Sequence, residues 1–248
     1  MLPEDKMETI NINCDLGEGT FNENEIMPYI QSCNIACGGH AGDLQSMKDV
    51  VSLALKYNIL IGAHPSYPDK ENFGRKSVDI SAKDLKESIS LQLENFDNVL
   101  QECNGKLHHI KAHGALYNDI ARDKRLATTF LEAVNMYKKR ALLYVPYNSI
   151  IADVAQENGF QILYEAFADR SYNEDLSLVK RTLPDAVLHD KNAILKQVQD
   201  IANHQKVVTI NGRSLFIKAA TFCVHSDTEN AAQIVKYLYN SLYTTAIG

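Results

Sequence analysis

Several motifs that often reveal a protein's chemistry are absent from this sequence. There is no G-x-x-x-x-G-K-[ST] stretch, which excludes a P-loop, and no G-x-G-x-x-G follows a predicted strand. H-E-x-x-H is also missing, and the adjacent pair His108-His109 lies on a predicted strand, where neighbouring side chains point to opposite faces. A metal site, if the chain has one, must therefore combine residues that lie far apart in the sequence.

Long apolar runs and cysteine pairs are scarce as well. No apolar run approaches the roughly 20 residues of a membrane-spanning helix, and the polar N-terminus M-L-P-E-D-K does not resemble a secretory signal. The five cysteines form no C-x-x-C pair, so free thiols in a reducing compartment are expected. Basic residues are scattered along a chain of net charge −6, which argues against nucleic acid as a partner. We therefore expect a cytoplasmic protein that binds neither membrane nor nucleic acid.

Short apolar runs with the pattern of strands alternate along the chain with amphipathic segments. Strands are predicted at 9–15, 34–37, 59–63, 107–112, 141–145, 161–166 and 215–224. Helices are predicted at 25–30, 44–55, 81–104, 116–137, 149–158, 190–203 and 228–242, the second capped by Asp43 and the third by Ser81. Residues 171–189 lack a clear period and are predicted to be a long loop, a length typical of functional or disordered segments.

This alternation predicts a parallel sheet with helices outside it. No Pro-, Gly- or Ser-rich linker divides the chain, so a single domain spanning residues 1–248 is expected. Seven or eight such units favour a closed (β/α) barrel, and an open doubly wound sheet is the alternative. In both architectures ligands bind at the carboxyl ends of the strands.

Ionisable residues follow most of the predicted strands. They are Asp15, Glu18, His40, His64, His113, Asp169, His225 and Asp227, and they include four of the eight histidines. Singly, a histidine after a strand is more often a hydrogen-bonded loop residue, and Asp43 or Asp227 can be a plain helix cap. A parallel barrel brings all these positions to one rim, where unpaired buried charges are costly. The set is therefore expected to pair internally or with a metal or substrate.

Three kinds of chemistry fit such a rim. Histidine and aspartate can bind a divalent metal with an open position for water, and Asp15, His40 and His64 are the ligands expected if a metal is present. Carboxylate and imidazole can instead act as general base and acid on an amide or lactam carbonyl. The amides of Gly38 and Gly39 would then be oxyanion donors, each worth about 3 kcal/mol. The third possibility is a rim that only binds a polar metabolite.

Six multi-residue motifs make the strand ends recognisable. They are N-C-D-L-G-E-G (13–19), N-I-A-C-G-G-H-A-G-D (34–43), I-G-A-H-P-S-Y-P-D (61–69) with F-G-R (73–75), K-A-H-G-A-L-Y-N (111–118), E-A-F-A-D-R-S-Y (165–172) and C-V-H-S-D-T (223–228). In this order, and over nearly the whole chain, they resemble the LamB/YcsF family. The departures from the family pattern at Gly39, Asn72, Ala112 and Ser226 leave the ionisable residues intact.

The resemblance implies a seven-stranded (β/α) barrel similar to the glycoside hydrolase/deacetylase barrels. It also implies ATP-dependent opening of 5-oxo-L-proline to L-glutamate, with ATP and Mg as the expected co-substrate and the 5-oxoprolinase subunits B and C as partners. A five-membered lactam closes readily because its ends are tethered, so phosphorylation of its oxygen would assist hydrolysis. Two alternatives stay open. One is a metal-dependent deacetylase or amidohydrolase acting alone on a small amide or sugar amide, and the other is a non-catalytic binding subunit.

On this hypothesis the catalytic residues are Asp15, His64 and His113. Asp15 or His64 is the base for the attacking water or the ring N–H, and His113 is the acid partner. The expected substrate-binding residues are Asn13, Glu18, Gly38, Gly39, His40, Arg75, Lys111, Asp169, Arg170 and His225. Within this group, Lys111 and the glycine amides would meet developing negative charge, and an arginine the substrate carboxylate.

Overall fold

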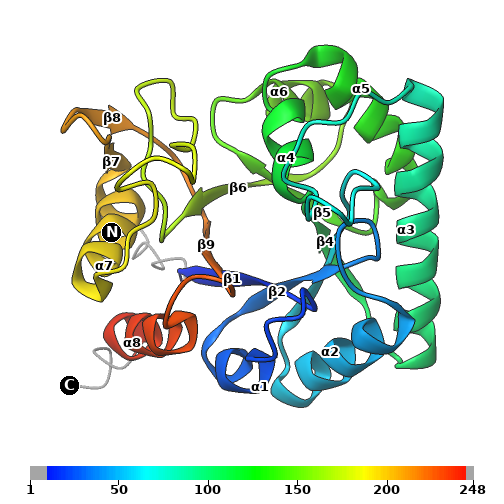
Figure 1. Cartoon of the computed structure of the whole chain (residues 1–248), viewed down its shortest axis with the longest axis horizontal. Coiled ribbons are helices and arrows are strands. Elements are labelled where there is room, and N and C mark those ends of the chain that lie inside the picture. Colours follow the sequence, from blue (N-terminus) through cyan, green and yellow to red (C-terminus); the bar gives the residue numbers. More distant parts are fainter. Residues whose placement is uncertain (1–9, 244–248) are drawn as a thin grey trace, which may run out of the picture.

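Seven parallel strands close into a barrel in the computed structural model, which describes residues 10–243 (Figure 1). Around the barrel they are β1 (Asn11–Leu16), β2 (Ser32–Ala36), β3 (Leu60–His64), β4 (Leu107–Ile110), β5 (Leu142–Pro146), β6 (Ile162–Phe167) and β9 (Thr221–His225). β9 pairs with both β6 and β1 and so closes the ring. The predicted seven-stranded (β/α) barrel is confirmed and the open sheet is wrong. Thr9, the predicted start of the first strand, lies outside the described residues.

Helices surround the strands on the outside of the barrel (Figure 1). They are α1 (Glu23–Ile26), α2 (Leu44–Tyr57), α3 (Ala82–Glu102), α4 (Gly114–Ile120), α5 (Lys124–Ala133), α6 (Ile150–Glu157), α7 (Lys191–His204) and α8 (Ala231–Tyr243), with short 3-10 turns at Met27–Tyr29 and Asn135–Tyr137. Asp43 and Ser81 cap α2 and α3 as predicted, each accepting a backbone N–H three residues on. Within residues 10–243, no helix is both long and apolar enough to cross a bilayer.

The predicted helix at 116–137 is wrong in its continuity. The structure breaks it into α4, α5 and a 3-10 turn. Asp123 causes the first break, because its side chain accepts the backbone N–H of Leu126 and so begins a new helix. An apolar period alone does not reveal such a restart, since both helices bury residues in the same register.

The predicted strand at 215–224 is also divided. Its first part is β8 (Ser214–Phe216), which pairs antiparallel with β7 (Lys206–Val208) in a separate hairpin. Gly212, at the predicted Asn211-Gly212 turn, adopts a φ of +80° that favours glycine. Only residues from Thr221 onward enter the barrel as β9.

Polar side chains fill the inside of the barrel beneath the strand ends. Asn13 Nδ2 donates to Glu165 Oε1 (2.9 Å), and Asn34 Nδ2 donates to Asn13 Oδ1 (2.8 Å). His109 Nε2 lies 2.7 Å from Asn34 Oδ1, and a Cβ on Gly62 would lie only 2.1 Å from that same nitrogen. Glycine is therefore required in β3 to admit the His109 ring. The network forms a rigid polar layer that supports the residues above it.

The long loop at 171–189 is confirmed and is anchored by Arg170. No helix forms there, although Arg170 bridges to Val187 and Tyr172 to Leu178. The buried Arg170 guanidinium donates to the carbonyls of Val179 and Ala186. The loop is therefore held against the barrel from its own first residues.

All five cysteines are free thiols, as expected. Cys14, Cys37 and Cys223 are buried, in agreement with their predicted role as small packing residues. Burial raises the pKa of the Cys33 and Cys37 thiols to about 12, so neither is a reactive thiolate.

Candidate active site

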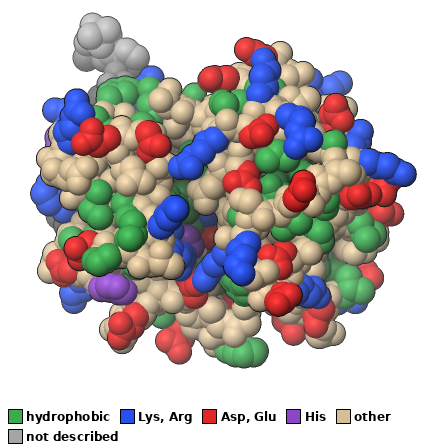
Figure 2. Space-filling model, turned by 45° about the horizontal axis from the view of Figure 1, so that its top comes forward, with side chains coloured by type: hydrophobic (Ala, Val, Ile, Leu, Met, Phe, Trp, Pro, Cys, Tyr) green, Lys and Arg blue, Asp and Glu red, His purple; other side chains and the backbone are tan. Residues whose placement is uncertain are grey.

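A cavity of about 790 Å³, called here the main cavity, opens at the carboxyl ends of the barrel strands. Its lining includes Asp15 at the end of β1, Glu18 in the following loop, His64 at the end of β3, and Lys111 and His113 just beyond β4. In Figure 2, Lys and Arg side chains gather around a hollow on the face turned to the viewer. The predicted rim is thus a cavity, at the edge where (β/α) barrels place their chemistry.

Asp15, Glu18, His64 and His113 form a tight group in this cavity, the four-residue cluster. One ligand atom from each lies within 4.8 Å of the others. His64 Nε2 is 3.4 Å from Asp15 Oδ2 and 3.0 Å from His113 Nδ1. Glu18 Oε1 is 3.2 Å from His113 Nδ1. The three predicted catalytic residues are therefore in mutual reach, and Glu18 joins them.

Backbone carbonyls determine which nitrogen of each imidazole carries the hydrogen in the neutral ring. His64 Nδ1 lies 2.8 Å from the carbonyl oxygen of Lys111, and His113 Nε2 lies 3.0 Å from that of Phe73. A carbonyl only accepts, so these nitrogens donate and the opposite nitrogens turn their lone pairs toward the cluster. Two lone pairs and two carboxylates then face one another. Such a set is stabilised by a shared proton or by a bound cation.

His40 supports the cluster from behind, without lining the main cavity. Its Nε2 lies 2.8 Å from Glu18 Oε1, and its ring stacks on His113 with centroids 3.5 Å apart. Burial alone would raise the pKa of Glu18, but hydrogen bonds from His113 and His40 bring it well below its usual range. Glu18 is therefore a carboxylate, and His40 positions it.

Lys111 is a fully buried cation beside the cluster. Its Nζ lies 3.0 Å from Asp15 Oδ1, 2.9 Å from Glu165 Oε1 and 3.1 Å from Cys223 Sγ. Burial would lower the pKa of Lys111, but Asp15 and its other partners raise it overall. Burial would likewise raise the pKa of Asp15, while His64 and Lys111 lower it well below its usual range. Both groups stay charged, and each holds the other in place.

Asp169 and His225 form a second pair, at the side of the main cavity. Asp169 accepts hydrogen bonds from the His225 amide (3.0 Å) and the Thr228 hydroxyl (2.6 Å), and it lies 3.0 Å from His225 Nδ1. These contacts outweigh burial and lower the pKa of Asp169 to about 2. Of the two predicted residues, His225 lines the cavity and buried Asp169 orients it.

Three predicted binding residues do not line the main cavity. The Gly38 amide donates to the Ala41 carbonyl (2.8 Å), so it is not free to meet an oxyanion. Gly39 packs against Gln92 of α3, since a Cβ there would lie 2.4 Å from Gln92 Oε1. Asn13 belongs to the polar layer inside the barrel. The prediction of paired glycine donors is therefore corrected, because the turn uses its own hydrogen-bonding groups.

The two predicted arginines differ in how free they are. The Arg75 guanidinium lines the main cavity and pairs closely with Asp227, which also pairs with Arg181 at 3.2 Å. Arg170 lines the cavity too, but its guanidinium is occupied by loop carbonyls. Arg75 remains a candidate for a substrate carboxylate, whereas Arg170 mainly holds the loop. Asp227 is not a helix cap, because α8 begins at Ala231.

Glu165, Tyr117 and Arg181 are the site residues that sequence reasoning missed. Glu165 is the second partner of Lys111 and is almost fully buried. Tyr117 and Arg181 both line the main cavity. Glu165 and Tyr117 lie within the E-A-F-A-D-R-S-Y and K-A-H-G-A-L-Y-N motifs, so an ionisable residue inside a strand was the available signal.

Acid is expected to destabilise the protein through His40. Burial lowers the pKa of His40 to about 4, and it also lowers that of His113. The unfolded chain binds these protons near pH 6.5, so the free energy of unfolding should fall as pH drops from about 6.5 to 4, by at most about 1.4 kcal/mol per pH unit and group. Urea denaturation across this range measures the slope. His40→Gln should flatten it, and a slope equal to that of the exposed control His189→Gln would contradict the assignment.

Comparison with known proteins adds to this geometry. Residues 10–248 match the model of the LamB/YcsF family. The chain is 36% identical over 241 residues to the A subunit of 5-oxoprolinase from Bacillus cereus (strain AH187), covering 95% of each chain. Identity and coverage are the same for the A subunit of 5-oxoprolinase from Bacillus thuringiensis subsp. konkukian (strain 97-27). Among solved structures, the lactam utilization protein from Thermus thermophilus superposes with a TM-score of 0.88 at 28% identity, covering 96% of this chain and 97% of that one.

Proposed function

Because the chain belongs to the LamB/YcsF family, we propose that it takes part in ATP-dependent hydrolysis of 5-oxo-L-proline to L-glutamate in the cytoplasm. It acts as the A subunit in a complex with 5-oxoprolinase subunits B and C. The observation that carries the proposal is the four-residue cluster, in which bases and carboxylates face one another beside a buried lysine. Relatives that match nearly their whole length are named for this activity.

The reaction requires activation of an unreactive amide. Transfer of the γ-phosphoryl group of ATP to the lactam oxygen forms an O–P bond and releases ADP. Water then adds to the activated carbon, and the ring C–N bond breaks as its nitrogen takes a proton, which leaves γ-glutamyl phosphate. A second water releases phosphate and completes L-glutamate. Two waters and one ATP are consumed for each ring opened.

The two cavity histidines can carry the proton of the attacking water. His64 presents a lone pair at Nε2 and takes that proton as general base, with Asp15 stabilising the imidazolium that forms. His113 Nδ1, only 3.0 Å away, receives the proton and delivers it to the ring nitrogen. Burial lowers the pKa of His113, which makes it neutral at first and a strong donor once protonated. Lys111 Nζ supplies fixed positive charge beside Asp15.

Glutamate release from 5-oxoproline tests the proposal. We expect release only when this chain, subunits B and C, and ATP are all present. Assays that omit each component in turn serve as controls. Release at the same rate without this chain, or without ATP, would refute the proposal.

The inward-facing lone pairs favour a second candidate, a metal-dependent amidohydrolase acting alone. The four-residue cluster offers two imidazole nitrogens and two carboxylate oxygens, a donor set that suits Zn²⁺ or Mn²⁺, and its carboxylates also suit the Mg²⁺ that accompanies ATP. The metal ligands expected from sequence are revised accordingly. Glu18 and His113 replace His40, whose Nε2 contacts Glu18 instead. A bound cation would neutralise the two carboxylates and polarise a water or a carbonyl.

Divalent cations are expected to stabilise the chain. At about 100 times the Kd, the gain of about 2.7 kcal/mol should raise Tm by about 5 °C or more. Thermal melts with Mg²⁺, Mn²⁺ and Zn²⁺, together with metal analysis of the purified protein, measure the effect. Glu18→Gln should abolish it and exposed His189→Ala should not. Glutamate-forming or amidase activity by the chain alone, lost to chelator, would favour the amidohydrolase over the ATP-dependent complex.

A further inference from the structure

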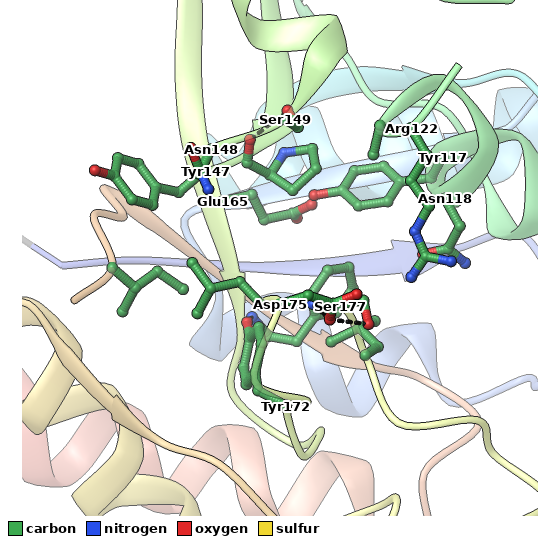
Figure 3. Close-up of a pocket in the computed structure, with 16 residues that line it drawn as sticks. Tyr117, Asn118, Arg122, Tyr147, Asn148, Ser149, Glu165, Tyr172, Asp175 and Ser177 are labelled. Atoms are coloured by element: carbon green, nitrogen blue, oxygen red, sulfur yellow. Dashed lines mark hydrogen bonds between the residues drawn. The ribbon is translucent and has the colours of Figure 1, made fainter. Parts of the chain in front are cut away.

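A second, smaller cavity of about 200 Å³, the side cavity, adjoins the main cavity. Its lining residues are Tyr117, Asn118, Ala121, Arg122, Pro146, Tyr147, Asn148, Ser149, Glu165, Phe167, Tyr172, Asp175, Leu176, Ser177, Leu178 and Ile217 (Figure 3). Tyr117, Arg122 and Phe167 line both cavities, so the two share a wall and a mouth. The proton-transfer residues of the proposed reaction all lie in the main cavity. The side cavity is thus available for a second ligand.

Two buried polar atoms on the lining of the side cavity lack a hydrogen-bond partner. They are Glu165 Oε2 and the Tyr117 hydroxyl, from side chains that are 2% and 5% exposed. Figure 3 shows the Tyr117 hydroxyl directed toward the Glu165 carboxylate. Leaving such groups unsatisfied costs about 1–3 kcal/mol each. A ligand that offers an N–H donor next to an acceptor would satisfy both.

Aromatic rings give the side cavity the character of a site for a flat molecule. Tyr147, Phe167 and Tyr172 line it together with Tyr117. Tyr172 is held in place because its hydroxyl accepts the Phe167 amide at 2.7 Å. Tyr147 packs edge-on against Tyr164, with ring centroids 5.2 Å apart. Fixed aromatic faces favour stacking on a planar heterocycle.

Cations lie at the shared mouth and along the adjoining part of the main cavity. Arg122 is exposed there and forms no ion pair with any residue in the described part of the chain. Lys180 and Arg181 line the main cavity beyond it, with Arg75 opposite Arg181 across Asp227. Asp175 is the acidic neighbour of Arg122, and its carboxylate is occupied by Ser177. A polyphosphate leaving the side cavity would therefore pass guanidinium and ammonium groups on its way to the cluster.

We propose that the side cavity binds the aminopurine ring of ATP, with the triphosphate passing Arg122 into the main cavity. The exocyclic amino group donates to Glu165 Oε2, and the Tyr117 hydroxyl pairs with a ring nitrogen. The ring stacks among Tyr147, Phe167 and Tyr172. This assignment rests on the proposed ATP-dependent function. It brings the γ-phosphoryl group toward the lactam without competition between the two substrates.

Equilibrium binding of the non-hydrolysable analogue AMP-PNP with Mg²⁺, to this chain and to its complex with subunits B and C, tests the assignment. Arg122→Ala should weaken AMP-PNP binding at least about 10-fold, because a charge-assisted contact is lost. Exposed Arg125→Ala on α5, which lines neither cavity, is the matched control and should leave it unchanged. Tyr117→Phe should weaken the analogue and leave 5-oxoproline affinity within about 2-fold. Inosine triphosphate places a carbonyl where the amino group would be, so it should bind at least about 10-fold more weakly than ATP.

The proposal is overturned if AMP-PNP does not bind to either preparation, or if Arg122→Ala and Tyr117→Phe leave its affinity unchanged. Competition between 5-oxoproline and AMP-PNP would also overturn it, since the side cavity would then be part of the lactam site. These outcomes are distinct from failure of the proposed function. ATP-dependent glutamate release by the complex, with nucleotide affinity untouched by the variants, would retain the reaction and place the nucleotide elsewhere.

Discussion

Asp15→Asn is expected to lower the rate of ATP-dependent glutamate release by the assembled complex at least about 100-fold, the scale of a lost acid or base. The carboxylate lies 3.4 Å from His64 Nε2 and accepts from Asn34 and Lys111 at 2.8 and 3.0 Å. Asparagine keeps the shape, but its neutral amide cannot stabilise a His64 imidazolium or attract a cation. His113→Ala should cause a similar loss, because it removes the acceptor of the proton that His64 has taken.

The matched control is Asp49→Asn, an exposed position on α2 whose carboxylate only accepts from Gln45. It should retain the wild-type rate. Circular dichroism and the urea midpoint show whether each variant remains folded. A folded Asp15→Asn complex that turns over within about threefold of wild type would remove Asp15 from the chemistry, whatever its contacts.

Lys111→Met is expected to reduce the free energy of unfolding by about 3–5 kcal/mol, the cost of removing one partner from a buried ion pair. Lys111 is 2% exposed and is the cation for both Asp15 and Glu165. Methionine fills similar volume but leaves two carboxylates buried without their countercharge. Urea denaturation at pH 7 measures the loss.

Two comparisons make this result specific to buried charge. Lys86→Met removes an exposed pair with Glu132 (3.4 Å) and should cost less than about 1 kcal/mol. Adding Glu165→Gln to Lys111→Met should restore part of the loss, since one orphaned carboxylate becomes neutral. If Lys111→Met costs no more than Lys86→Met, the buried lysine is not a structural countercharge.

The sign of the pH effect supplies a further check on the same variant. His64 and Lys111 lower the folded-state pKa of Asp15 below its unfolded value near 4. The resulting stability is present above about pH 4 and is lost as pH falls below it. The difference between wild type and Lys111→Met should therefore shrink toward acid pH, and a difference that grows would contradict the pairing.

The barrel and its rim were predictable because they depend on periodic, local patterns. Apolar runs alternating with amphipathic segments specify parallel strands with helices outside, and parallel strands bring their carboxyl ends to one edge. That is why Asp15, His64 and His113, which belong to three different strand ends, could be placed together before any coordinates. The two errors in element boundaries, at Asp123 and at residues 215–220, come from a cap and a hairpin that an apolar pattern does not show.

What the tertiary structure decided is how each group at that edge is used. The His64 lone pair faces the cluster only because the Lys111 carbonyl, 47 residues away, accepts from Nδ1. Likewise the Gly38 amide is occupied by its own turn. Glu165 matters because β6 lies beside β9 in the closed ring and so reaches Lys111. The sequence by itself determined which chemical groups reach the rim, since strand periodicity is local. Protonation and pairing depend on contacts between distant segments, and those exist only once the barrel closes.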